Sequence, residues 1–298
     1  MACMGLILYC ASPVRAQLES QLSAYTGANA SGYLAPLIDA FGADLNAATF
    51  HTAHIPKWGL NVSLELRYSS VRFSESDRVF NGTTENDFSP VTIREVPTVV
   101  GDRRAVFVDG DGGTRYAFPG GFDLSSFSMI VPQLRIGSLY GTEALIRYFY
   151  FNLSREEFGS FNIFGFGLRH SISQYFDKSL PVDVAFSFFW QQFSLDDSER
   201  GDDLVTADAL TAGLHVSRRF KVFEPYAGIT YDKFDVDVSY QSESDLDSID
   251  LSFDSGDALH LTFGVSYQLA FMAASGEYNI GNQNAFSFGL AFQFRPIQ

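Results

Sequence analysis

The chain has 298 residues, of which 46% are hydrophobic and 15% aromatic, and its formal net charge is −15. This acidic balance excludes nucleic-acid binding through overall charge. The mean hydropathy is near zero. Beyond the start of the chain, no uninterrupted apolar run approaches the ~18 residues that a membrane-spanning helix needs. The apolar residues are instead dispersed at short spacing, which is typical of strands.

The first sixteen residues are predicted to be a secretory signal peptide. Residues 5–12 form a short apolar run, and Val14-Arg15-Ala16 is typical of a cleavage site before Gln17. No Lys or Arg precedes the apolar run, which departs from the usual pattern. Cleavage would remove Cys3 and Cys10, the only cysteines in the sequence. We therefore expect an exported chain without a disulfide.

Residues 17–56 are expected to form an N-terminal helical plug segment, because they are rich in small residues and lack β-branched runs. Ser31 can cap a helix that covers Tyr33 to about Ala40. Pro36 would fall in its first turn, where a missing N–H matters least. The residues expected to pack from this helix are Tyr33, Leu34, Leu37, Ile38 and Phe41.

From Trp58 onward, large apolar residues take every second position, as in the last run FSFGLAFQF, residues 286–294. Such a pattern predicts strands. The clear and weaker runs cover 58–72, 127–136, 143–153, 160–173, 181–193, 206–217, 223–238, 258–270, 272–280 and 284–294. Most are longer than the about 5–6 residues of soluble strands and match the ~9–11 residues of a tilted membrane strand.

The links between these runs tend to alternate in length. The long links are 74–126, 194–205 and 239–257, and the short ones include 137–142, 174–180 and 218–222. Outer-membrane barrels have short periplasmic turns and longer outer loops. We therefore predict an all-β protein in which residues 57–298 form a closed antiparallel transmembrane β-barrel, preceded by a short α-helix. A soluble sandwich, which also alternates, is the alternative.

The strand count is predicted as about twelve, within a range of ten to fourteen. Residues 104–121, RAVFVDGDGGTRYAFPGG, indicate a hairpin by their Asp/Gly turn. If this hairpin extends back to Thr98 it could span the membrane, although Arg103 or Arg104 would then face lipid at a cost of ~2–4 kcal/mol near the midplane. With only ten strands, we expect the helix at the periplasmic mouth, since an internal helix needs a wide barrel.

Polar residues opposite the apolar face would line the lumen or hold the plug. Those expected to do so are Glu65, Arg67, Arg169, Asp183, His215, Glu224 and His260. Two acidic loops carry further carboxylates, among them Asp196, Asp197, Asp202, Asp203, Asp245 and Asp247. Solvated, mutually repelling loops are the simpler interpretation. The functional one is a mouth that attracts cations, or bridging of lipopolysaccharide by divalent ions.

No catalytic residue, metal site or cofactor is predicted. The DGDGG stretch, residues 109–113, lacks the later oxygen ligands of a calcium loop. His51 and His54 could share a helical face, but no third ligand is evident. His215-Val216-Ser217 resembles the His-x-Ser motif of outer-membrane lipid A deacylases, yet that family continues with Asn where this chain has Arg218. A lipid hydrolase is therefore the least favoured function.

Two further stretches resemble sequence patterns of known outer-membrane barrels. Ser287, Gly289, Phe292 and Phe294 match the polar-x-Gly-x-x-aromatic-x-aromatic signal that barrel-assembly machinery reads, although residues 295–298 extend beyond it. Residues 33–53 and the strand that follows resemble an uncharacterised family of outer-membrane β-barrels with an N-terminal helical plug. More loosely they are similar to FadL-like hydrocarbon transporters, whose N-terminal segment plugs the lumen.

These resemblances imply the outer membrane of a Gram-negative-type bacterium, with outer-membrane lipid, lipopolysaccharide and the assembly machinery as partners. The expected function is a porin-like channel or transporter for a small molecule, at least partly plugged, with a hydrophobic cargo by analogy to the FadL-like proteins. The alternative is a non-conducting structural or partner-docking barrel. The cargo and the oligomeric state do not follow from the sequence.

Overall fold

The computed structural model describes residues 27–85, 87–155, 158–176, 180–197, 203–241, 248–254 and 258–294. The predicted signal peptide, residues 17–26 and the tail after Phe294 lie outside these ranges. Within them, no helix is both long enough and apolar enough to cross a membrane.

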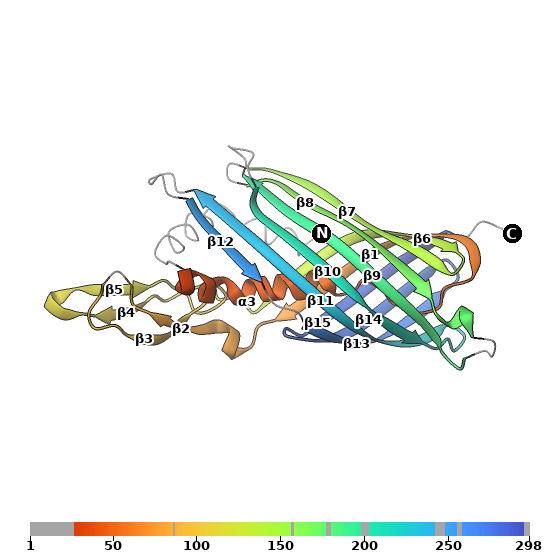
Figure 1. Ribbon diagram of the computed structural model, residues 1–298, viewed down its shortest axis with the longest axis horizontal. Helices are drawn as coiled ribbons and strands as arrows, with labels where there is room; N and C mark the ends of the chain where they lie inside the picture. Colours follow the sequence, from red (N-terminus) through yellow and green to blue (C-terminus); the bar gives the residue numbers. More distant parts are fainter. Residues whose placement is uncertain are drawn as a thin grey trace.

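Ten antiparallel strands of the described chain close a barrel (Figure 1). They are β1 (Trp58–Arg72), β6 (Ser126–Leu139), β7 (Thr142–Arg155), β8 (Phe158–Ser171), β9 (Asp183–Asp197), β10 (Asp203–Ser217), β11 (Phe223–Gln241), β13 (Ala258–Leu269), β14 (Met272–Ile280) and β15 (Ala285–Phe294). Strand β1 closes the ring by pairing with β6 and β15. The short β12 (Ser248–Asp254) pairs with the upper part of β11, beyond the closed ring. The predicted closed antiparallel barrel is confirmed, with ten strands instead of about twelve.

The two sides of each strand differ as the alternation predicts. In β1, Leu64 and Leu66 are 50% and 48% exposed, whereas Glu65 and Arg67 are 2% and 4% exposed. The FSFGLAFQF run of β15 likewise turns its Phe side chains outward. Because the sheet closes on itself, its main-chain groups pair within the wall, so the apolar outer face is suited to hydrocarbon.

The two ends of the barrel are built differently. The short-turn end carries the turns 140–141, 218–222 and 270–271 and the start of β1. The long-loop end carries the 73–125 link between β1 and β6. This link contains two hairpins, which project beyond the barrel in Figure 1. They are β2 (Val79–Thr83) with β3 (Ile93–Pro97), and β4 (Val106–Asp109) with β5 (Arg115–Phe118).

The hairpin predicted around the Asp/Gly turn is confirmed as β4 and β5, but it does not cross the membrane. The 3₁₀ turn η2 (Asp111–Gly113) joins its strands, and Gly112 and Gly113 adopt φ values of 68° and 84° that favour glycine. Arg103 and Arg104 are exposed beyond the barrel, which avoids the cost of an arginine in lipid. Further 3₁₀ turns are η1 (Glu75–Arg78) and η3 (Ser173–Tyr175).

Helix α3 (Gly27–Asn46) has 20 residues and begins earlier than predicted, so Pro36 lies within it and not in its first turn. The turns of α3 before Tyr33 are held by tertiary contacts, which the local sequence does not reveal. The Asn29 amide donates to the Thr83 carbonyl at 2.7 Å and accepts from the Thr83 N–H at 3.0 Å. Burial raises the pKa of the Tyr33 phenol, which keeps its proton and donates to the Gly120 carbonyl at 2.9 Å.

The N-terminal part of α3 lies among the hairpins beyond the barrel, and its C-terminal part lies inside the long-loop half, against apolar side chains of the wall (Figure 1). The Phe41 ring packs edge-to-face on Phe193 and Phe234, with centroids 4.8 and 5.6 Å apart. Gly42 approaches Phe234 so closely that an added Cβ would lie 2.6 Å from the ring. Small residues on α3 thus let a ten-strand barrel hold a helix. The expectation that ten strands would leave the helix at the periplasmic mouth is wrong.

Candidate functional site

The candidate site is the barrel lumen together with the N-terminal segment that occupies it, residues 27–56. After α3 ends, residues 47–56 have no regular secondary structure and continue through the short-turn half toward the start of β1. All but His54 and Pro56 are buried. An irregular buried segment must find partners for its backbone groups outside itself, and the barrel wall supplies several of them.

Arg147 of β7 holds the end of the helix. Its guanidinium donates to the carbonyl oxygens of Leu45 at 2.8 Å and Ala47 at 3.3 Å, and to the side-chain oxygens of Gln133 and Gln191, each at 3.0 Å. The Arg147 residue is 1% exposed. A cation at a helix C-terminus also interacts favourably with the helix dipole. Arg147 therefore satisfies the Ala47 carbonyl and shares the Leu45 carbonyl with Gln191.

A second cluster surrounds His51. The Arg67 guanidinium donates to His51 Nδ1 at 2.6 Å. The carboxylate of Glu65 lies 3.3 Å from Arg67 and 2.9 Å from Arg135 and accepts from Gln133 at 2.7 Å. These charges are buried but mutually paired, as buried charges must be.

The remaining contacts to residues 47–56 come from other strands of the wall. Glu277 accepts from the Ala48 N–H at 2.8 Å, and the Ser217 hydroxyl accepts from the Ala53 N–H at 3.0 Å. Arg169 donates to the Thr52 carbonyl, and the Thr52 hydroxyl donates to Glu224. Donors and acceptors of the segment are thus matched by side chains from separate strands.

The structure places six of the seven expected lumen residues as buried side chains inside the barrel. They are Glu65, Arg67, Arg169, His215, Glu224 and His260. Asp183 lies at the short-turn end, where its carboxylate is 3.0 Å from His54 Nδ1 and 34% exposed. His260 pairs with Asp232 at 2.8 Å and lines a cavity beside α3.

Sequence reasoning missed several residues that contact the segment or pair with side chains that contact it. They are Gln133, Arg135, Glu143, Arg147, Gln191 and Glu277. All six lie within the alternating runs, on the side opposite the outward apolar residues. Their alternation with the outward apolar residues therefore predicts that they face inward, particularly in the runs 127–136 and 143–153.

The other expected residues lie as follows. Tyr33, Leu34 and Ile38 are buried, and Leu37 and Phe41 pack partly buried against the same apolar cluster. Ser287 and Gly289 face inward, whereas Phe292 and Phe294 face outward. Gly289 has a packing role as well, because a Cβ there would collide with the Arg67 guanidinium.

The acidic loops are only partly described. Asp196 accepts a hydrogen bond from Ser160, Asp197 ends β9 and Asp203 begins β10. Asp202, Asp245 and Asp247 lie outside the described residues.

The histidine motifs do not assemble a reactive group. His215 Nε2 bonds to the Ser187 hydroxyl at 2.6 Å, whereas Ser217 donates to Glu224 at 2.7 Å. His215 and Ser217 are therefore not paired with each other. In the part of the chain that the structure describes, no three His, Cys, Asp or Glu residues are grouped to hold a metal ion.

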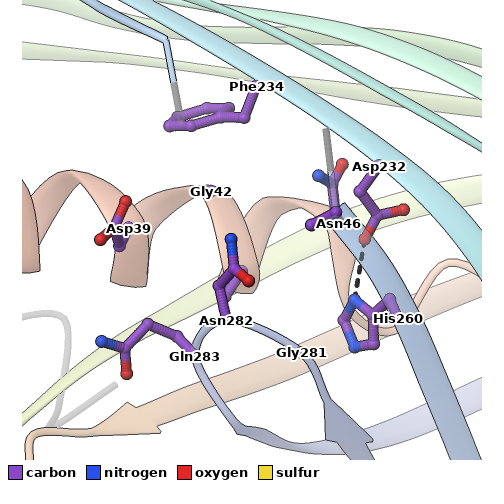
Figure 2. Close-up of a pocket in the computed structure, with 11 residues that line it drawn as sticks. Asp39, Gly42, Asn46, Asp232, Phe234, His260, Gly281, Asn282 and Gln283 are labelled. Carbon is purple, nitrogen blue, oxygen red and sulfur yellow. Dashed lines mark hydrogen bonds and ion pairs between the residues drawn. The ribbon is translucent and has the colours of Figure 1, made fainter. Parts of the chain in front are cut away.

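Two cavities flank the segment. A polar cavity of about 270 Å³ lies at the short-turn end, lined among others by Thr52, Asn61 and Arg135. A smaller one of about 50 Å³ lies beside α3, between the helix, β11, β13 and the β14–β15 turn (Figure 2).

In fold, the chain is similar to solved outer-membrane barrels at low identity. The outer membrane protease OmpT from Escherichia coli is 10% identical, with a TM-score of 0.36 over 81% of this chain and 98% of that chain. The transport unit of the E. coli autotransporter AIDA-I is 12% identical, with a TM-score of 0.35 over 88% and 99%. The Ralstonia pickettii toluene transporter TbuX is 11% identical, with a TM-score of 0.28 over 82% and 92%. These likenesses carry no functional argument.

Among curated protein sequences, none is significantly similar to this chain. The expected membership of an uncharacterised barrel family is confirmed by a family profile that matches residues 1–294. The chain belongs to DUF6588, a family of unknown function.

Proposed function

We propose that this protein is a plugged outer-membrane channel, closed in this conformation by residues 27–56, through which a small molecule passes when part of that segment shifts. The short-turn end would face the periplasm and the long-loop end the outside, as in other outer-membrane barrels. Residues 1–16 would direct export, and the final strand would be recognised by the barrel-assembly machinery. Outer-membrane lipid and lipopolysaccharide would surround the barrel.

The observation that carries this proposal is the polarity of the wall around residues 47–56. Gln133, Arg169 and Glu224 exemplify a lining that water can solvate once the segment moves, as in barrels with polar interiors. The polar cavity of about 270 Å³ next to this region gives the segment room to shift into.

This lining also bears on the cargo. A route through the short-turn half would run past paired Arg and Glu side chains, so a small polar solute is favoured over a hydrophobic one. An enzymatic role has less support, because Ser187 and His215 are 0% and 5% exposed and a substrate would have no access to them.

A reducible cross-link between plug and wall tests the proposal. Thr211 donates to Asn46 Oδ1 at 2.9 Å, so cysteines at these two positions can be joined through disulfides by a short bis-methanethiosulfonate cross-linker. In planar bilayers, we expect the cross-linked Asn46→Cys/Thr211→Cys protein to show fewer openings than wild type, and a reductant to restore them. The two single variants control for pairing with Cys3 or Cys10.

A second candidate, a non-conducting docking barrel, is favoured by one observation. The hairpins at the long-loop end expose Val91, Ile93 and Phe107, which are 73%, 71% and 51% exposed. If wild type and the reduced double variant both conduct no more than an empty bilayer, the channel proposal fails and the docking barrel is preferred.

A further inference from the structure

The turn between β10 and β11 is the most basic stretch of an acidic chain. Arg218, Arg219 and Lys221 place three cations within four residues, which occurs nowhere else in the sequence. The turn lies at the short-turn end, opposite the two hairpins (Figure 1). Phe220 and Phe223 close it by exchanging two backbone hydrogen bonds of 2.7 and 3.0 Å, so the cations project from a defined backbone.

The three cations have different surroundings. Arg219 turns toward the lumen and is paired, since its Nε and Nη2 donate to Glu224 at 3.1 and 3.0 Å. Arg218 and Lys221 are exposed, and within the described ranges neither forms an ion pair with a carboxylate. On the adjacent strand β9, the carboxylate of Asp183 already lies 3.0 Å from His54 Nδ1. Arg218 and Lys221 can therefore bind an anion from outside the chain.

Arg218 lies on the side of β10 that faces hydrocarbon. Leu214 and Val216 precede it on this side with a period of two, and Phe220 follows it. These three residues are 45%, 40% and 49% exposed. The Arg218 guanidinium lies over the Phe220 ring, 5.1 Å from its centroid, so the side chain extends toward the tip of the turn. A long basic side chain on an apolar face reaches the level of lipid headgroups in this way.

Exposed apolar residues continue the outer face beside these cations. The Val222 carbonyl accepts from the Gln268 N–H at 2.6 Å, which joins the turn to the end of β13. Val222, Leu269 and Phe271 are 44%, 52% and 64% exposed. A ligand on the cations therefore lies next to apolar surface. A soluble anion would use the charges alone, whereas a lipid with an anionic headgroup would use both.

The chemistry of the two cations selects a phosphate group. A guanidinium matches phosphate oxygens in a bidentate geometry, and a lysine ammonium adds a compact positive charge. Basic side chains next to a membrane-spanning segment bind anionic lipid headgroups for this reason. In the orientation proposed above, the short-turn end lies in the periplasmic leaflet, whose lipids are phospholipids.

We propose that the β10–β11 turn binds the phosphate group of an anionic phospholipid through Arg218 and Lys221, with the acyl chains along the exposed apolar residues of β10 and β13. The choice of the periplasmic leaflet rests on the proposed orientation of the barrel. Binding itself requires only that the barrel is embedded in lipid, and it does not depend on whether the barrel conducts.

The test is native mass spectrometry of the full-length protein in detergent micelles with equal amounts of phosphatidylglycerol and phosphatidylcholine of the same acyl chains. We expect wild type to prefer phosphatidylglycerol by about fivefold or more, since each Lys or Arg near an anionic headgroup strengthens binding by about that factor. Arg218→Gln/Lys221→Gln is expected to lose this preference. Arg103→Gln/Arg104→Gln, which removes two exposed cations beyond the barrel, is expected to keep it.

Three results would overturn the proposal. Equal retention of the two lipids by wild type needs no variant and would show contact with acyl chains alone. An Arg218→Gln/Lys221→Gln protein that keeps its heat-modifiable mobility and its preference would place the site elsewhere. Displacement of the lipid by an equal concentration of glycerol phosphate would indicate a soluble anion as the ligand. Lipid preference without conductance would retain this site and reject the channel, and conductance without lipid preference would do the reverse.

Discussion

The two halves of the lumen hold the same segment by different interactions. In the long-loop half, a helix packs on apolar side chains, whereas in the short-turn half irregular backbone is held by polar ones. Near the end of α3, the inward residues of several strands change from apolar to polar toward the short-turn end. The pairs are Val131 and Gln133 in β6, Phe193 and Gln191 in β9, Ala209 and Thr211 in β10, and Phe234 and Asp232 in β11.

The end of α3 lies at this same level, where Gln191 donates to the Leu45 carbonyl at 2.7 Å and Thr211 to Asn46 at 2.9 Å. The wall changes from apolar to polar because the backbone of the segment changes from helical to irregular. A helix satisfies its own N–H and C=O groups, so an apolar wall suits it. An irregular segment cannot do so, and an apolar wall would leave its groups unpaired at roughly 1–3 kcal/mol each.

The largest effect is expected from Arg147→Leu, which removes the donor at the boundary between the halves. The carbonyl of Ala47 and the side chain of Gln133 then lose a buried partner, at roughly 1–3 kcal/mol for each group. We expect a frequently open channel in planar bilayers, with the barrel itself intact by its heat-modifiable mobility. Arg104→Leu removes an exposed arginine as the control. Equal conductance of the two variants would contradict the role assigned to Arg147.

The next effect is expected from Phe41→Ala in the apolar half. Removing a core phenyl group costs about 3–5 kcal/mol when the site is fully buried, and Phe41 is partly buried, so the lower end applies. Hydrogen exchange should accelerate across α3 while Ala48 and Ala53 stay protected. Acceleration of equal size in both halves would show that they are not held independently.

A smaller effect is expected from Gly289→Ala. The new Cβ would displace the Arg67 guanidinium and weaken its hydrogen bond to His51, costing about 1–3 kcal/mol as overpacking usually does. The urea midpoint of the purified protein should fall. If Gly289 acts through the assembly signal alone, membrane insertion would decrease and the urea midpoint of the inserted protein would stay as in wild type.

The sequence predicts the regular elements of the molecule better than the irregular segment. The period of two revealed the strands and their outer face, because lipid requires strict alternation. The apolar spacing of Leu34, Leu37 and Phe41 revealed a helix, but not its start, since Asn29 is held by a distant hairpin. The partners of residues 47–56 could not be found, because irregular backbone has no period and its contacts come from many strands. Arg147 is an example. Its position in the alternating run predicts that its side chain faces inward, but not that it bonds to the Leu45 carbonyl.

Hydrogen–deuterium exchange of the wild-type protein in detergent tests the central claim most directly. Within the described ranges, the Ala48 and Ala53 N–H groups are held by side chains of the wall, Glu277 at 2.8 Å and Ser217 at 3.0 Å. We predict that both amides exchange far more slowly than the same residues in an unfolded peptide, although neither lies in a helix or strand. Exchange at the unfolded rate, with α3 still protected, would show that the polar half of the lumen does not hold the segment.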